Sequence, residues 1–215
     1  MRFTVPIIII AFCVVFKMIV NRNPKNDPDA EFLELERKAN LTPRKDISGL
    51  PYIKVPVSEL PLDVPTDSEE TKERQETIRS MADKQILNLT GMTNTELKLE
   101  YGAPNINILS AADANYTRLV QAISFLASDY VDHQHITEAR ELLEYGVSIG
   151  TDSKRTYMLL ASIYKEEGHP EKINDLIESA EKINSLLKDS IISSLQNLLI
   201  SSSPVDDLSM ERTVT

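Results

Sequence analysis

The feature that most constrains how this chain can fold is the spacing of its apolar side chains between residues 110 and 200. The first apolar stretch holds Tyr116, Leu119, Val120, Ile123, Leu126, Ala127 and Tyr130. Steps of three and four residues place all of them on one face of an α-helix. Polar breaks separate this stretch from similar ones that begin near residues 136, 157, 173 and 186. The spacing predicts an all-α fold of successive antiparallel helices, which a glycine count of only six in 215 residues also favours.

Apolar or small residues also recur at a step of 34 residues. The step joins Leu126 to Leu160, Ala127 to Ala161, Tyr130 to Tyr164, Ala139 to Ile173, Leu143 to Ile177 and Gly146 to Ala180. A fixed period of this length is typical of stacked helical hairpins, in which each unit buries an apolar face against the next. Small side chains at positions 127, 139, 161 and 180 would let the paired helices cross closely.

The residues at this period resemble the tetratricopeptide repeat family. Leu126-Ala127-Ser128-Asp129-Tyr130 and Leu160-Ala161-Ser162-Ile163-Tyr164 are similar to its Leu-Gly-x-x-Tyr element, with alanine in place of glycine. Three positions match later small residues of the family: Ala139, Gly146 and Ala180. The chain departs from the family at Ile173, at Ile123 and Tyr157 in place of tryptophan, and at Thr151 and Ser185 in place of the closing proline. The resemblance implies two stacked hairpins followed by a terminal helix that caps them.

The same resemblance implies a binding surface. In this family the first helices of the hairpins present a concave face to a partner peptide. The residues expected on that face are Gln121, Ser124, Ser128, Arg155, Met158, Ser162 and Lys165. They lack the lysine and asparagine set with which some members hold a C-terminal carboxylate. The alternative is that these side chains only face solvent.

Five prolines interrupt residues 40–66: Pro43, Pro51, Pro56, Pro61 and Pro65. Proline at this density forbids a helix of any length, yet many apolar side chains lie between the prolines. The segment is interpreted as an extended strap on the helical body, with a flexible spacer as the alternative. The flanking patterns predict helices over about residues 28–39 and 67–89, and a short one over residues 94–101.

Residues 3–20 form an apolar block that only Thr4 and Lys17 interrupt. A membrane-spanning helix needs roughly 20 mostly apolar residues, so the block predicts a single N-terminal transmembrane helix in which Lys17 extends to the headgroups. A cleaved signal, a lipoprotein signal at Cys13 and a buried helix fit less well. The basic residues at the C-terminal end of the block, Lys17, Arg22 and Lys25, favour a cytoplasmic body.

Together these features divide the chain into five parts. They are a transmembrane anchor (1–21), a juxtamembrane helix with the proline-rich strap (22–66), N-terminal capping helices (67–109), tetratricopeptide-like repeats with a C-terminal capping helix (110–200) and a disordered tail (201–215).

The distribution of charge excludes one class of partner. The whole chain has a net charge of -10, although residues 1–25 carry basic and no acidic side chains. An acidic body is repelled by phosphate backbones, so nucleic acid is a poor candidate partner. Cys13 is the sole cysteine, which excludes an intramolecular disulfide.

Catalysis and metal binding find little support in the sequence. The cluster with metal-ligand side chains is Asp129, Asp132, His133 and His135. These residues fall at a helix end and turn, where polar side chains are expected anyway, so no metal site and no cofactor are predicted. No glycine-rich phosphate loop and no nucleophile beside a base occur, so an enzyme is not expected.

Three functional hypotheses follow from the sequence. The first is a membrane-anchored protein–protein interaction module whose hairpin stack binds a protein segment. The second is a structural accessory subunit of a membrane complex, whose own strap fills the groove. The third, less favoured, is an enzyme or a metal-binding protein that uses Asp129, His133 and His135. Neither the partner nor the oligomeric state follows from the sequence.

Overall fold

The computed structural model describes residues 12–17 and 28–200. Within them the chain is helical and forms no strand, which confirms the all-α prediction for this part of the chain. The elements are α2 (Pro28–Asn40), α3 (Glu69–Arg79), α4 (Asn94–Tyr101), the 3₁₀ turn η1 (Ala103–Asn105), α5 (Ile106–Asp132), α6 (Ile136–Ser148), α7 (Lys154–Glu166), α8 (Lys172–Glu181) and α9 (Lys188–Ile200). Contacts divide these residues into two units: unit 1 contains the residues up to Asp46 and Thr93–Ile106, and unit 2 contains Ile47–Met92 and the residues from Asn107.

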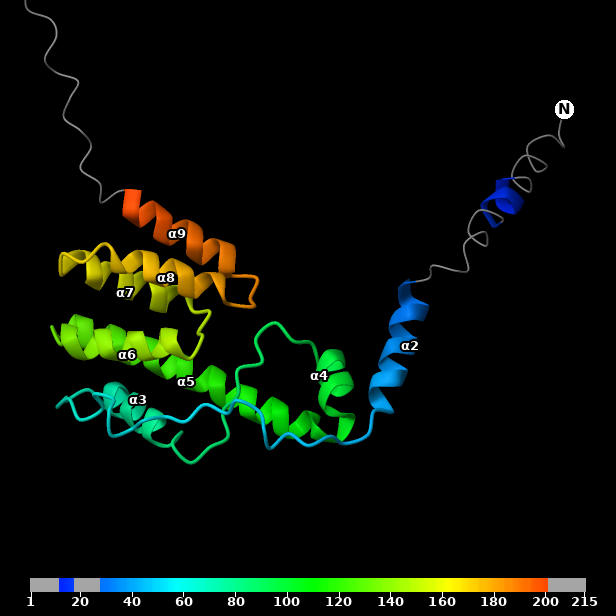
Figure 1. Cartoon of the computed structure of the whole chain (residues 1–215), viewed down its shortest axis with the longest axis horizontal. Helices are drawn as coiled ribbons and strands as arrows, with labels where there is room; N and C mark the ends of the chain where they lie inside the picture. Colours follow the sequence, from blue (N-terminus) through cyan, green and yellow to red (C-terminus); the bar gives the residue numbers. More distant parts are fainter. Residues whose placement is uncertain (1–11, 18–27, 201–215) are drawn as a thin grey trace, which may run out of the picture. The chain divides into compact units, whose positions relative to one another are not determined.

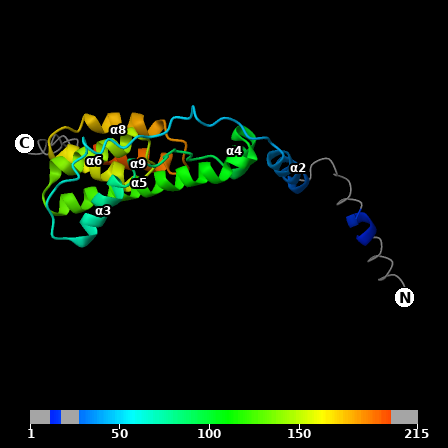
Figure 2. The same ribbon diagram turned by 90° about the horizontal axis from the view of Figure 1, so that it is seen from below.

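Unit 2 is a layered stack of helices that follow one another in chain order (Figure 1). Helix α7 packs against α6, α8 and α9, and α8 also packs against α9. Helices α5 and α6 approach closely at Gly146, where an added Cβ atom would lie 3.3 Å from Ile123 Cγ2. The view in Figure 2 shows the same stack turned by 90°. Successive antiparallel helices therefore pack as neighbours, as the apolar spacing predicts.

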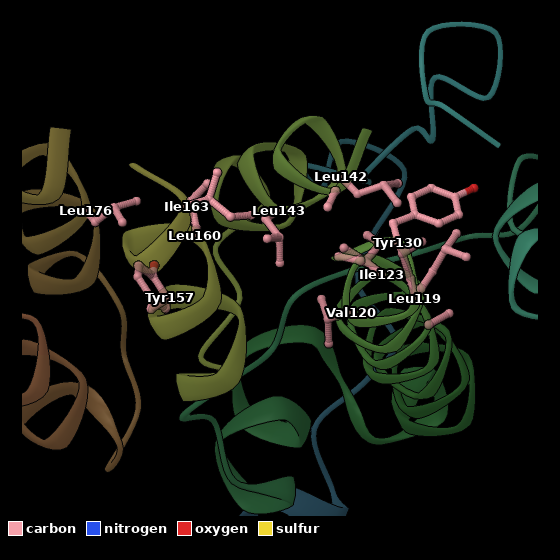
Figure 3. Close-up of a cluster of buried hydrophobic side chains, with 14 of the residues drawn as sticks. Leu119, Val120, Ile123, Tyr130, Leu142, Leu143, Tyr157, Leu160, Ile163 and Leu176 are labelled. Carbon is pink, nitrogen blue, oxygen red and sulfur yellow. The ribbon is translucent and has the colours of Figure 1, made fainter. Parts of the chain in front are cut away.

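The core of unit 2 includes most of the side chains that the 34-residue step pairs. Buried members include Leu126, Leu160, Ala127, Ala161, Tyr130, Tyr164, Ala139, Ile173, Leu143 and Ala180. Figure 3 shows side chains from α5, α6, α7 and α8 gathered in this core. Each fully buried aliphatic or aromatic side chain contributes about 1.5–3 kcal/mol through removal from water, so burial at these positions stabilises the stack.

The proline-rich segment lies against this core. Val55 and Leu62 are buried, and Ile53 and Val64 are packed against the core cluster. The Ile53 amide donates to the Ile86 carbonyl at 2.9 Å, and Tyr130 Oη donates to the Pro61 carbonyl at 2.8 Å. Residues 50–64 are therefore an ordered strap and not a free spacer.

The helix that was expected over residues 67–89 is shorter than predicted. It begins after Ser68, whose Oγ accepts from the Thr71 amide, and it ends at Arg79. Turns follow, and Ile86, Leu87 and other buried apolar residues then lie on an extended segment. The prediction was wrong because apolar residues at these spacings also fit an extended chain that bonds to the strap.

Unit 1 joins α2 and α4 through a small polar network. Helix α4 has the predicted bounds and begins with a capping box formed by Thr93 and Glu96. Helix α2 packs against α4, where Glu36 accepts from Thr95 Oγ1 and pairs with Lys98 at 3.2 Å. Asn105 is fully buried and donates to the carbonyls of Lys45 and Tyr101.

The predicted transmembrane helix at residues 3–20 lies mostly outside the described residues. The described part, residues 12–17, is helical and exposes Phe12, Val14, Val15 and Phe16. Among the helices that the structure describes, none is both long enough and apolar enough to cross a bilayer. The predicted tail, residues 201–215, also lies outside the described part.

Candidate functional site: a groove along α5 and the start of α7

A groove of about 480 Å³ runs over unit 2 between α5 and the N-terminal turn of α7. Its lining residues are Thr90, Tyr116, Thr117, Val120, Gln121, Ser124, Phe125, Asp152, Ser153, Arg155 and Leu187. Helix α5 supplies the floor because its other face is buried against α6. The volume falls within the range of about 300–1,000 Å³ that ligand-binding clefts occupy.

Ser124 gives this groove an unpaired polar atom. Its side chain is 4% exposed and lines the groove, and its Oγ has no hydrogen-bond partner among the described residues. Leaving a buried hydroxyl unpaired costs about 1–3 kcal/mol, so such atoms are uncommon in native proteins. A ligand that supplies a donor or an acceptor here would remove that cost.

An aromatic ring and a guanidinium form one wall. Phe125 is 43% exposed, and the Arg155 guanidinium lies 4.9 Å from the centre of its ring. Arg155 Nη2 also donates to Ser128 Oγ at 2.8 Å, so the charge of Arg155 is held by neutral groups. By contrast, Arg74 lies 5.6 Å from the same ring but pairs with the carboxylates of Asp129 and Glu70.

One end of the groove is closed by two loops that are distant in sequence. Gly91 has φ +86°, and a Cβ atom there would collide with the Asn184 carbonyl oxygen. Next to this contact, Asp152 accepts a hydrogen bond from Ser185 Oγ at 2.7 Å. The loop after α8 therefore both closes the groove and fixes the carboxylate of Asp152.

The negative charge of Asp152 affects the pKa of two buried tyrosines. Burial and, second, the negative charge of Asp152 raise the pKa of Tyr157 to about 12. The same two causes, in the same order, raise the pKa of Tyr116 well above its usual value. Tyr116 Oη accepts from Asn88 Nδ2 at 2.9 Å, whereas Tyr157 Oη has no partner among the described residues. Both hydroxyls remain protonated at neutral pH.

The structure brings together four of the predicted partner-binding residues. Gln121, Ser124 and Arg155 line the groove, and Ser128 binds Arg155. The other three lie on α7 beyond the lining: Met158 is packed against the core cluster, and Ser162 and Lys165 are half-buried.

Sequence reasoning missed Phe125, Asp152, Thr90 and Leu187. Phe125 falls outside the apolar period of its helix and was detectable as a large exposed side chain. The other three come from loops or a helix start, and no local pattern marks them.

The histidine cluster does not assemble a metal site. Asp129 accepts from Thr71 Oγ1 and Arg74, and His133 Nδ1 lies 2.7 Å from the Asp129 carbonyl oxygen. A separate pocket of about 320 Å³ contains His133 and His135 beside Tyr130 and the start of α3. Within the part of the chain that the structure describes, no three His, Cys, Asp or Glu side chains are placed to hold a metal ion.

The strap follows a different surface from the groove. Its carbonyls accept hydrogen bonds from Tyr145 Oη, Tyr130 Oη, Gln75 Nε2 and Arg79. None of residues 47–66, all of which are described, lines the groove. The groove therefore remains open beside the strap.

Comparisons of the chain with protein-family models, with curated proteins and with solved structures give no match.

Proposed function

We propose that unit 2 is a tetratricopeptide-like hairpin stack that binds an extended protein segment in the groove between α5 and α7. The observation that carries the proposal is Ser124, a buried hydroxyl without a partner in the floor of a groove. Support also comes from the packing of α7 against α6, α8 and α9, the arrangement that a hairpin stack requires.

The groove has the mixed character of a peptide site. Val120, Phe125 and Leu187 offer apolar contact, while Ser124 and Gln121 offer hydrogen bonds. An extended peptide has both backbone polar groups and side chains to bury, so it uses both kinds of surface. Phe and Arg are also both enriched in protein–protein interfaces relative to the rest of the surface.

A photo-crosslinking experiment tests the groove. A benzophenone amino acid replaces Gln121, which is exposed at the groove, and in a matched control replaces Glu141, which is exposed on α6. We expect a discrete adduct from position 121 in native cells and none of the same mass from position 141, because only the first position faces the ligand. Equal adducts at both positions, or none at either, would contradict the proposal.

We further propose that residues 3–20 hold the protein at a membrane, with the body on the cytoplasmic side. The support is the apolar block itself and the basic residues at its C-terminal end, Lys17, Arg22 and Lys25. The full chain should remain in the membrane pellet after alkaline carbonate extraction, and removal of residues 3–20 should release it. Protease added outside sealed vesicles of plasma-membrane orientation should leave the body intact. Extraction of the full chain by carbonate would overturn the anchor.

A further inference from the structure

The closed end of the groove stops a chain that enters from the other end. Thr90 lines the groove there, and its carbonyl lies 3.5 Å from Asn184 Nδ2. The neighbouring Gly91 touches Asn184 so closely that no side chain fits between them. A peptide lying along α5 must therefore end or turn outward at this point.

A carboxylate lies at this closed end. Asp152 lines the groove and accepts from Ser185 Oγ, a neutral donor next to Asn184. The serine orients the carboxylate without neutralising it. A positive group placed in the closed end would be attracted to this charge.

A cation lies just beyond this carboxylate in the chain. Asp152 precedes the N-cap residue Ser153, and Arg155 lies in the first turn of α7. It rests on Phe125 and Ser128, both neutral. Ser124, whose buried Oγ has no partner among the described residues, also lines the groove, on α5. The groove thus offers a negative closed end, a hydroxyl in its floor and a positive wall.

We propose that this groove receives the free N-terminus of a partner protein. The α-ammonium group binds Asp152, a backbone polar group pairs with Ser124 Oγ, and an acidic side chain among the first three residues binds Arg155. This inference rests on the proposed function, because it names the ligand of the same groove.

Paired peptide pools test the ligand chemistry. Random hexapeptides with free N-termini, and the same pool N-acetylated, are incubated with the full chain in detergent micelles, and retained peptides are identified by mass spectrometry. We expect enrichment only from the free pool, with Asp or Glu among the first three positions. Acetylation removes the charge, so it should weaken the best peptide about tenfold or more in calorimetry.

Matched variants locate the contacts. Asp152→Asn should lower the affinity for the free peptide about tenfold and leave the acetylated peptide unaffected. Asp189→Asn, the same charge change at an exposed acid on α9, should change neither affinity. Ser124→Ala should weaken binding about fivefold without lowering the melting temperature, since its hydroxyl has no partner to lose in the free protein.

The outcomes separate this inference from the function on which it rests. If acetylated peptides bind as well as free ones, or if binding requires a lysine side chain, the N-terminal inference is overturned. The peptide-binding function survives that result as long as Arg155→Glu still weakens the retained peptides. The Gln121→Trp variant obstructs the groove at an exposed position. If the native chain retains no peptide better than this variant does, both proposals fail.

Discussion

The strap side and the groove side of unit 2 differ in how their buried polar groups are hydrogen-bonded. On the strap side, Tyr130 Oη accepts from Gln75 Nε2 and donates to the Pro61 carbonyl, and Arg79 bonds to Leu62 and Asp63. On the groove side, the Ser124 hydroxyl has no partner among the described residues, and neither do the hydroxyls of Thr156 and Tyr157 at the start of α7. The strap side has one such atom as well, Tyr52 Oη.

This contrast separates a surface that is completed within the chain from one that is left incomplete. The strap supplies apolar side chains and carbonyls to the helices that it covers, so that surface gains stability on folding. No segment among residues 28–200 covers the groove in this way, and the Ser124 hydroxyl has no partner within the described part of the chain. The groove is therefore the better candidate for an external ligand.

The largest expected effect tests whether the strap is part of the core. Leu62 is 1% exposed, so Leu62→Ala should lower the free energy of unfolding by about 2–5 kcal/mol through lost burial and a cavity. Phe125→Ala on the groove side, where 43% of the side chain is exposed, should cost much less. Urea unfolding followed by circular dichroism measures both. Similar costs for the two variants would erase the distinction between the surfaces.

An alkaline titration compares buried tyrosines on the two sides. Burial raises the pKa of Tyr145, which donates to the strap carbonyl of Lys54, to about 12. Burial and Asp152 raise the pKa of Tyr157 to the same value. An unfolded tyrosine loses its proton near pH 10, whereas these folded ones hold it to about pH 12. Their contribution to stability is therefore complete below pH 10 and declines as the pH rises toward 12.

The expected loss is up to about 1.4 kcal/mol per pH unit for each tyrosine in that window. Tyr157→Phe and Tyr145→Phe should each flatten the decline, since phenylalanine has no proton to lose. Unfolding free energies from urea titrations between pH 9 and 12 provide the measurement. An unchanged slope in either variant would show that its tyrosine titrates normally in the folded protein.

The smallest expected effect on stability comes from removing single tyrosine hydroxyls on the two sides. Tyr130→Phe removes two hydrogen bonds and leaves the Pro61 carbonyl without its donor, so it should cost about 1–2 kcal/mol at neutral pH. Tyr157→Phe removes a hydroxyl that has no partner, so it should be neutral or slightly stabilising. Thermal melts of the two variants make the comparison. A larger cost for Tyr157→Phe would show that its hydroxyl is bonded in solution.

The helices of unit 2 and much of its core could be predicted from local spacing. The positions joined by the 34-residue step are buried in the structure except for Ile177, which is half-buried. Such prediction succeeds because an apolar face at helical spacing must be buried wherever the helix packs. It failed at residues 80–89, where the same spacing is met by an extended chain bonded to Ile53.

The candidate site was predictable only in part. Gln121, Ser124 and Arg155 were expected on a binding surface through the resemblance to the tetratricopeptide repeat family, and all three line the groove. Asp152 and the closed end were not predicted, because they depend on a contact between Gly91 and Asn184. Residues so distant in sequence leave no local pattern.

The sequence by itself determined the helical class, the order of the helices in unit 2 and which faces are buried. These properties follow from steric preferences and from the removal of apolar side chains from water, both of which act over a few residues. Only the tertiary structure decided the path of the strap, the open groove and the unpaired hydroxyl of Ser124. These features depend on which segment, distant in sequence, packs against each surface. A segment that covers one surface cannot also cover another.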